Sequence, residues 1–435
     1  MKIGIIQFPG TNCERETRMA LTRCGMEAVS FLWNEDRRML EDCDGFVLAG
    51  GFSYEDRSRS GIIAALDPVI PVIREAASRG KPVLGICNGA QVVVEAGLVP
   101  DLSSHGSTPE IALTTNKRIK DGRIIGTGYY NTWSTLRAEH PVREQNPWYR
   151  GTFTSRFSPG ECITVPAAHG EGRFLFPPEL LEAMESWGLI PFRYADAAGV
   201  LRDEFPVNPN GSQAQAAAVT NLEGTVMAMM PHPERTEAGD KIFLSMADFI
   251  SREKTITVTG GEKPKLPAVV IPDPEPFHRE AESEELIIRQ IITDNEAVTV
   301  ESTLEHLGIS ARIQRHVHWE IEFDPQLSQP KRRELLERMS ESGELYNSNK
   351  ELPVSLQPPE GSRTLLVRER EDIAGAKTAQ ALRSWFGCTG VSTVTRGILW
   401  TVIPEGNEPA DAVTDAVLRT HILMNPHAYK GYIYA

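Results

Sequence analysis

One cysteine in the sequence has the surroundings of a reactive nucleophile. Cys87 stands in the string Gly85-Ile86-Cys87-Asn88-Gly89-Ala90-Gln91, between an apolar run and the start of a helix-like stretch. Glycines two residues before and after the cysteine permit a sharp turn that exposes its side chain. Backbone N–H groups and the positive end of the helix favour thiolate over thiol. The alternative is a buried structural cysteine beside packing glycines.

A base and a carboxylate follow about 145 residues later, in the string Met230-Pro231-His232-Pro233-Glu234-Arg235. Two prolines flank His232 and limit the freedom of its backbone. An imidazole held in this way can take up the thiol proton and later protonate a leaving amine, while Glu234 fixes its tautomer. Cys87, His232 and Glu234 are therefore predicted to form a catalytic triad. By itself, a histidine is more often a surface or capping group.

Glycine-bearing loops are candidates for the rest of the pocket. The backbone N–H groups of Gly50 and Gly51, which follow a predicted strand, would suit an oxyanion hole, although a simple turn also explains them. The loops 168–174 and 208–212 are expected to be pocket walls. The predicted substrate-binding residues are Gly50, Gly51, Gln91, His169 and Glu171.

The remaining cysteines indicate neither a metal site nor a disulfide framework. The six cysteines are spread over the chain and include no CxxC pair. We therefore expect that the chain binds no metal ion and is located in the reducing cytoplasm. Cys13 competes with Cys87 as a nucleophile. It follows a proline–glycine turn that offers no equivalent base, so Cys87 is the predicted nucleophile.

The elements that must position these residues alternate between apolar and amphipathic. Apolar runs at 3–7, 27–32, 45–48, 82–86 and 225–230 alternate with helix-like stretches at 14–24, 62–78 and 241–250. That alternation is typical of a parallel sheet wrapped by helices. Residues 1–252 are therefore predicted to form an α/β domain with a flavodoxin-like, doubly wound, mostly parallel sheet. Cys87 would stand at the end of the strand 82–86.

The composition changes after residue 252. Residues 253–285 are rich in proline and charge, which predicts an extended linker. A weak internal repeat follows, with one copy at 286–360 and the other at 361–435. Each copy is expected to run strand, helix, two strands and helix, so the chain should end in a smaller α+β region of two ferredoxin-like repeats.

Bulk properties exclude several classes of function. A net charge of -14 argues against nucleic-acid binding, which requires clustered lysine and arginine. No run approaches the roughly 18 apolar residues of a spanning helix, so we expect no membrane insertion. The short apolar run 3–6 lacks a cleavage site behind it and is interpreted as a strand rather than a signal peptide. Small molecules are the expected substrates.

Six motifs occur in a fixed order: FPGTNCE, LAGGFSYED, GICNGAQ, AAHGEGRF, NPNGS and MMPHPER. Together they resemble the glutaminase subunits of phosphoribosylformylglycinamidine synthase, the PurQ type of class I (triad) glutamine amidotransferase. The resemblance covers residues 1 to about 250. It implies that Cys87 attacks the side-chain amide of L-glutamine and forms a glutamyl thioester, with His232 as base and Glu234 as its orienter.

The same resemblance implies a division of labour. Ammonia would pass to a separate synthetase subunit of the PurL type, which would bind ATP and Mg²⁺ and convert formylglycinamide ribonucleotide to formylglycinamidine ribonucleotide. No cofactor is expected in this chain, which contains no GxxxxGK[ST] string. Two alternatives remain: a glutaminase subunit that serves a different ammonia acceptor, and a non-catalytic assembly scaffold.

The chain departs from the family pattern in one loop and extends beyond it at its C-terminal end. Glu55 replaces a glycine of the family string GGFSYGDYLR. The C-terminal copies resemble the small accessory subunit of the same synthase, the PurS type, most closely at 379–394 and 423–429. Since that subunit pairs with itself, the copies are expected to pair within the chain or to drive self-association. A generic ferredoxin-like module is the alternative.

Overall fold

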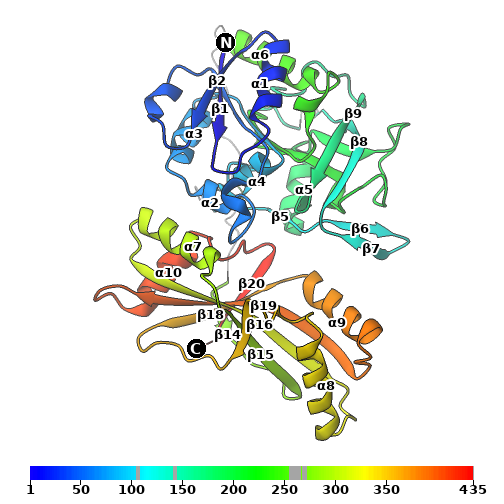
Figure 1. Ribbon diagram of the computed structural model, residues 1–435. Helices are drawn as coiled ribbons and strands as arrows, with labels where there is room; N and C mark the ends of the chain where they lie inside the picture. Colours follow the sequence, from blue (N-terminus) through cyan, green and yellow to red (C-terminus); the bar gives the residue numbers. More distant parts are fainter. Residues whose placement is uncertain (104–107, 141–144, 254–265, 267–271, 435) are drawn as a thin grey trace. The chain divides into compact units, whose positions relative to one another are not determined.

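The computed structural model describes residues 1–103, 108–140, 145–253, 266 and 272–434. The chain divides into two units, Met1–Val270 and Ile271–Ala435 (Figure 1). No helix in these described ranges combines the length and the apolar character that are needed to cross a membrane.

A nine-stranded sheet with the order β2-β1-β3-β4-β13-β12-β11-β8-β9 forms the centre of the first unit. Its first five strands are parallel, and apolar side chains fill both faces of the inner ones, as in sheets covered by helices on both sides. They are β2 (Glu27–Leu32), β1 (Lys2–Gln7), β3 (Gly45–Leu48), β4 (Val83–Ile86) and β13 (Val226–Met229). The predicted α/β domain with a parallel central sheet is confirmed.

Helices connect the parallel strands. In α3, the buried residues Val69, Ile70, Ile73 and Ala76 recur with helical spacing and form one apolar face. Helices α1 and α6 contact each other in the first unit (Figure 1). The helices are α1 (Glu14–Arg23), α2 (Ile62–Ala65), α3 (Val69–Ser78), α4 (Asn88–Glu95), α5 (Pro178–Ser186) and α6 (Asp240–Glu253), with short 3-10 turns η1 (Arg37–Leu40), η2 (Ser53–Asp56), η3 (Gln213–Gln215) and η4 (Pro233–Arg235).

Four antiparallel strands extend the sheet beyond β13, an addition that the sequence motifs do not predict. They are β12 (Ala216–Thr220), β11 (Phe192–Ala195), β8 (Tyr130–Ala138) and β9 (Cys162–His169). Two small ribbons accompany them, β5 (Ala112–Thr114) with β10 (Arg173–Leu175) and β6 (Lys117–Lys120) with β7 (Arg123–Thr127). Most of these strands lie between or outside the recognised motifs.

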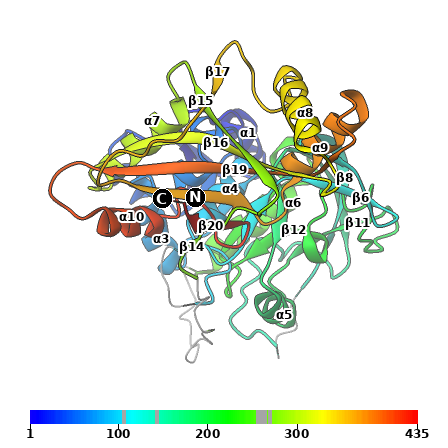
Figure 2. The ribbon, with the colours of Figure 1, turned by 90° about the horizontal axis from the view of Figure 1, so that it is seen from below.

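The second unit is a seven-stranded sheet with the order β14-β20-β18-β19-β16-β15-β17 (Figure 2). Two successive stretches each run strand, helix, strand, helix, strand. The first holds β15 (Ser283–Gln290), α7 (Asn295–His306), β16 (Ala311–Phe323), α8 (Gln329–Glu341) and β17 (Glu351–Val354); the second holds β18 (Arg363–Glu369), α9 (Ile373–Trp385), β19 (Val391–Pro404), α10 (Ala410–Arg419) and β20 (Tyr429–Ile433).

The prediction of two strands after the first helix of each copy is wrong, because the structure has one long strand in place of the two. No turn interrupts 311–323 or 391–404, so the strand continues through the residues predicted to connect them. The long strands β16 and β19 pair antiparallel, from Ala311 opposite Pro404 to Phe323 opposite Val391. The core at one end of this pair takes residues from both stretches, including Leu335 and Met339 of α8 and Ala379 and Leu382 of α9.

The predicted linker 253–285 is described only in part. Residues 254–265 and 267–271 lie outside the described residues. Further on, the strand β14 (Glu275–Pro276) pairs with β20, and the Phe277 ring stacks on Tyr434 with 5.5 Å between ring centroids. Strand β15 begins at Ser283. The linker therefore ends earlier than the composition predicts.

Candidate active site

Four loops meet at the carboxyl edge of the parallel strands. Cys13 follows β1, Gly50 follows β3, Cys87 follows β4 and His232 follows β13, and these strands are consecutive in the sheet. The carboxyl ends of parallel strands share one edge, so residues far apart in sequence come together there. A methyl group added to Gly50 would lie 3.1 Å from Cys13 Sγ, 3.2 Å from His232 Cε1 and 3.4 Å from Cys87 Cβ.

Cys87 occupies a strained turn between β4 and α4. Its φ of +52° and ψ of -108° lie outside the usual regions for a residue with a side chain. The packing of α4 on the sheet enforces this turn, because a methyl group on Gly89 would lie 1.9 Å from the carbonyl oxygen of Leu48. Its N–H donates to the carbonyl of Met229 at 2.8 Å, which joins the turn to β13. This is the backbone of a nucleophile elbow.

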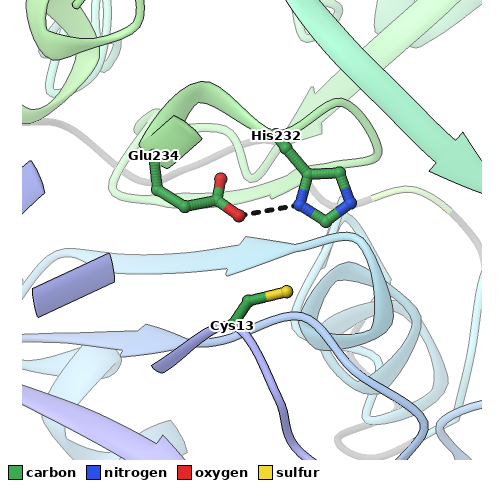
Figure 3. A group of neighbouring side chains, drawn as sticks. All are labelled: Cys13, His232 and Glu234. Atoms are coloured by element: carbon green, nitrogen blue, oxygen red, sulfur yellow. Dashed lines mark hydrogen bonds and ion pairs between the residues drawn. The ribbon is translucent and has the colours of Figure 1, made fainter. Parts of the chain in front are cut away.

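The imidazole of His232 is oriented by Glu234. His232 Nδ1 and Glu234 Oε1 are 2.7 Å apart, and the side chains are 2% and 0% exposed (Figure 3). Pro233 begins the short turn η4, which places Glu234 beside the ring that precedes it by two residues. The His232 N–H donates to the carbonyl of Pro166 on β9 at 2.8 Å. Hydrogen bonds thus fix both the ring and the backbone of His232.

The neighbours of His232 favour its protonated form. Burial of the ring lowers its pKa, but negative charge on Cys87 and Glu234 and hydrogen bonds with the thiols of Cys13 and Cys87 outweigh burial and raise the pKa well above its ordinary value. A thiolate next to an imidazolium is the reactive form of a cysteine nucleophile. The arrangement of Cys87, His232 and Glu234 can therefore carry out acyl transfer.

Cys13 is a residue of this site that the sequence argument set aside. The turn that holds Cys13 offers no base of its own, but the fold brings His232 close to Cys13. The argument that Cys13 has no base beside it is therefore wrong. One donor atom each of Cys13, His232 and Glu234 lies within 4.8 Å of the other two (Figure 3). The Arg235 guanidinium donates to Cys13 Sγ at 3.2 Å. The place of Cys13 directly after the first strand was the signal in the sequence.

Gln91 and Glu171, both predicted to bind substrate, come together beside the elbow. Gln91 Nε2 donates to the Glu171 carbonyl at 2.7 Å, and the hydroxyl of Ser60 donates to Glu171 Oε2 at 2.8 Å. Asp56, which the sequence argument missed, accepts a hydrogen bond from Asn88 Nδ2 at 3.2 Å. Burial and the charge of Glu171 raise the pKa of Asp56 to about 7, against a hydrogen bond from Ser60.

The two predicted glycines join the loop after β3 to the loop after β1. The Gly50 carbonyl accepts the N–H groups of Asn12 and Cys13, each at 3.1 Å, and the N–H of Phe52 donates to Gly10. The N–H of Gly51 is not used in this bridge. Gly51 has a φ of +155°, and a methyl group on it would lie 2.6 Å from the Gly10 carbonyl oxygen. A larger residue would push these loops apart.

His169 ends β9 and lies beside the site as a neutral residue. Burial, with a smaller effect from His232, lowers the pKa of His169 to about 3. Asn116 Nδ2 donates to the His169 carbonyl at 2.7 Å. The Asn210 amide donates to the carbonyl of Gly172 at 2.7 Å, so both predicted pocket-wall loops contact each other.

Residues 1–242 match the family described as CobB/CobQ-like glutamine amidotransferase domain. The chain is 40% identical over 272 residues to the phosphoribosylformylglycinamidine synthase subunit PurQ of Methanothrix thermoacetophila, across 59% of this chain and 100% of that protein. It is 40% identical over 259 residues to the PurQ subunit of Methanosarcina mazei, across 58% of this chain and 99% of that protein. A solved structure of PurLQS from Thermotoga maritima matches 57% of this chain and 98% of its own, with 30% identity and a TM-score of 0.44.

Proposed function

Because the chain belongs to the CobB/CobQ-like glutamine amidotransferase family, and within it to the PurQ subunits, we propose that it is the glutaminase of phosphoribosylformylglycinamidine synthase. It hydrolyses L-glutamine to glutamate and ammonia for purine biosynthesis. The observation that carries this proposal is the strained Cys87 turn beside His232, whose ring is held by Glu234 at 2.7 Å. A nucleophile, a base and an orienting carboxylate in one buried cluster form the machinery of acyl transfer.

The reaction proceeds in two halves. Cys87 Sγ attacks the side-chain amide carbon of glutamine, and the C–N bond breaks as His232 gives a proton to the departing nitrogen. This half yields a glutamyl thioester and ammonia. A water molecule then attacks the thioester carbon while His232 accepts its proton, and the bond to sulfur breaks to release glutamate and the thiol. Glu234 holds the ring by Nδ1, so Nε2 is the nitrogen that exchanges protons.

Two backbone N–H groups are suited to hold the developing oxyanion. The Gly51 N–H is not used in the bridge between the loop after β1 and the loop after β3. The Asn88 N–H is at the first turn of α4, where helical N–H groups have no partner within the helix. A donor from the residue after the nucleophile and one from a neighbouring loop form the oxyanion hole of other nucleophile elbows.

The carboxylates of Asp56 and Glu171 are suited to the α-ammonium group of glutamine. Neither forms an ion pair with a lysine or arginine among the residues that the structure describes. The charge of Glu171 raises the cost of charging Asp56, so a cationic group beside both would be stabilised. Gln91, which donates to the backbone of Glu171, would hold that residue in position.

The ammonia acceptor is proposed to be a PurL-type synthetase subunit, which would hold ATP and Mg²⁺, while this chain needs no cofactor for hydrolysis. The relatives are named as subunits of one synthase, which supports a multi-subunit enzyme. The second unit is proposed to be two PurS-like, ferredoxin-like halves that pair within the chain and dock the synthetase. Its two strand-helix-strand-helix-strand stretches support this. The reactive thiol suits the reducing cytoplasm.

The proposal is tested with Cys87→Ala in the complex of this chain with its synthetase. We expect loss of glutamine-dependent synthesis of formylglycinamidine ribonucleotide and full retention of synthesis from ammonium, because the acceptor site is on the partner. Cys24→Ala, a change at a buried thiol that caps the C-terminal end of α1, is the matched control. Equal loss of both syntheses would contradict the proposal. Glutamate release without amination of formylglycinamide ribonucleotide would favour a different acceptor.

A further inference from the structure

A cleft in the second unit takes no part in the proposed hydrolysis. It has a volume of about 590 Å³, which is within the usual range of small-molecule sites. Its walls come from the C-terminal ends of β15 and β17, the N-terminal half of β16 and the first turn of α7. All of its lining residues lie within 289–357, so the cleft belongs to this unit alone. It is a candidate binding site made of residues separate from the Cys87 cluster.

The cleft exists because β15 and β16 separate from each other. Strand β15 pairs with β16 only as far as Ile288 opposite Val317, whereas β16 continues beside β19 to Ala311. On that side, residues 311–316 face no other strand that the structure describes. The Ile313 N–H donates to the Glu301 carboxylate of α7 at 2.9 Å instead of to a strand. Alternate residues of a strand point the same way, so the N–H of residue 315 also faces this open edge.

Arg289 and His316 give one side of the cleft a positive charge and an imidazole. They come next after the pair Ile288–Val317 on their two strands, so their side chains project from the same face of the sheet. His316 is 8% exposed, and its Nδ1 has no hydrogen-bond partner among the described residues. Burial and the charge of Arg289 lower the pKa of His316, so the guanidinium is close enough to act on the ring.

The charge of Arg289 is the one that the lining leaves unbalanced. Arg315 Nη1 lies 3.2 Å from Asp294 Oδ2, and Arg315 Nε lies 2.5 Å from Glu296 Oε2. The Arg289 side chain forms no ion pair or hydrogen bond with any residue that the structure describes. A guanidinium with free N–H groups beside an imidazole suits a phosphate group, whose oxygens accept several hydrogen bonds.

Amides and apolar side chains make up much of the remaining wall. The side chains of Gln290, Gln314 and Gln357 have no hydrogen-bond partners within the described ranges. A glutamine amide offers a donor and an acceptor side by side, which is the pattern that pairs with the edge of a nucleobase. Apolar lining residues, among them Val298 of α7 and Ile313 of β16, suit the faces of a flat ring. The cleft therefore fits a molecule that joins a phosphate to a base.

We propose that this cleft binds a nucleoside monophosphate, with the phosphate beside Arg289 and His316 and the base among the glutamine amides and the apolar side chains of α7 and β16. None of these residues belongs to the glutaminase machinery. The inference therefore goes beyond the proposed function and does not depend on it.

Isothermal titration calorimetry of the full chain with AMP, GMP, CMP and UMP in turn tests the binding. We expect at least one of them to bind one-to-one, and its nucleoside, which lacks the phosphate, to bind roughly 10-fold more weakly or less. Arg289→Gln should weaken binding of the nucleotide roughly 10-fold or more, and His316→Leu roughly 3- to 10-fold. Arg312→Gln is the matched control, because Arg312 is an exposed arginine of the same strand outside the lining of the cleft.

Circular dichroism checks that each variant is folded. Absence of binding by all four nucleotides overturns the inference, as does equal binding by the unaltered chain and folded Arg289→Gln. Equal binding of a nucleotide and its nucleoside overturns it as well, because the phosphate then contributes nothing. Cys87→Ala should bind the nucleotide as the unaltered chain does. A chain that binds the nucleotide but releases no glutamate in complex with its synthetase counts against the proposed function alone.

Discussion

The protonation of His232 sets the pH range of the proposed reaction. Burial opposes its charge, but Cys87 and Glu234 favour it and raise the pKa of His232 well above its usual value. The proton that the ring gives to the leaving nitrogen is present below this pKa and lost above it. Glu234→Gln removes one of the stabilising charges, so we expect the alkaline limb of the kcat/KM profile to move to lower pH. We also expect kcat to fall roughly 100-fold or more, because the tautomer is no longer fixed.

The measurement is the pH profile of glutamate release, with Glu237→Gln as the matched control. Glu237 is an exposed carboxylate in the same segment, so its removal should leave the profile in place. An unchanged alkaline limb in Glu234→Gln would mean that Glu234 does not act through His232.

His169 makes the first unit sensitive to acid. Burial lowers the pKa of His169 to about 3 in the folded chain, while an unfolded histidine has a pKa of about 6.5. Below about pH 6.5 the unfolded chain therefore binds a proton that the folded chain does not. The stability that depends on this neutral ring is fully present above pH 6.5 and is lost as the pH falls toward 3, by up to about 1.4 kcal/mol per pH unit.

We expect the free energy of unfolding to depend less steeply on pH in His169→Gln than in the unaltered chain between pH 6.5 and 4. Urea titrations followed by hydrogen exchange in residues 1–253 measure the slope. His306→Gln, at an exposed histidine of the second unit, is the control. Parallel curves for His169→Gln and the unaltered chain would refute the buried neutral state.

Local sequence predicted the residues whose surroundings are local. The glycines around Cys87 and the prolines around His232 are neighbours in the chain, so the turn and the histidine–glutamate pair are visible in short strings. Cys13 and Asp56 acquire their neighbours only when distant strands align, as the contacts with Arg235 and Asn88 show. No spacing in the sequence contains that information.

At the scale of elements, the turn after Gly51 is strained. Tyr54, Glu55 and Asp56 have φ values of +51°, +58° and +54°, in the left-handed region that favours glycine. Glu55 is the residue that replaces the family's glycine. Glu55→Gly should therefore stabilise the first unit by roughly 0.5–1 kcal/mol, the relief of backbone strain exceeding the added entropy of the unfolded chain.

The same substitution in a regular element is the control for this prediction. Glu75→Gly, at an exposed position of α3, should destabilise the unit by about 1 kcal/mol. Urea denaturation compares the two variants with the unaltered chain. A loss of stability in Glu55→Gly would show that the Glu55 side chain, which pairs with Arg57, outweighs the strain.

Prediction of the elements was best where helices alternate with buried strands. The parallel strands and their helices follow from that alternation. The antiparallel strands β8 and β11 carry no comparable alternation in their sequence. Each pairs with a strand that is distant in the chain, so local sequence does not identify its partner. The strands β16 and β19, of thirteen and fourteen residues, are longer than most strands, and the sequence pattern within them predicts two shorter strands in place of each.

At the scale of the whole molecule, each unit has a core of its own. The buried cluster of the first unit runs from Ile3 to Ile250, and the clusters of the second unit lie within 287–399. We expect a chain that ends after Glu253 to fold and to keep the hydrogen-exchange protection of β1, β3, β4 and β13, because its core is complete. It should bind the synthetase more weakly if the second unit docks that partner.

Hydrogen exchange and a binding titration with the synthetase measure the two effects separately. A chain that ends instead after Pro404 is the control, since it removes only part of the second unit. Unfolding of the chain that ends after Glu253 would show that the first unit depends on the second. Undiminished binding to the synthetase would remove the docking role.

The pairing of β16 with β19 within one chain has an evolutionary consequence. In an assembly of two identical subunits, every substitution appears twice and must suit both places. Here the two halves that share a core are encoded separately, so a change in one leaves the other as it was. Asn425 and Pro426 stand before the last strand of the second half, and the first half has no such pair. Each half can therefore specialise for a different neighbour while the shared core holds them in a fixed one-to-one ratio.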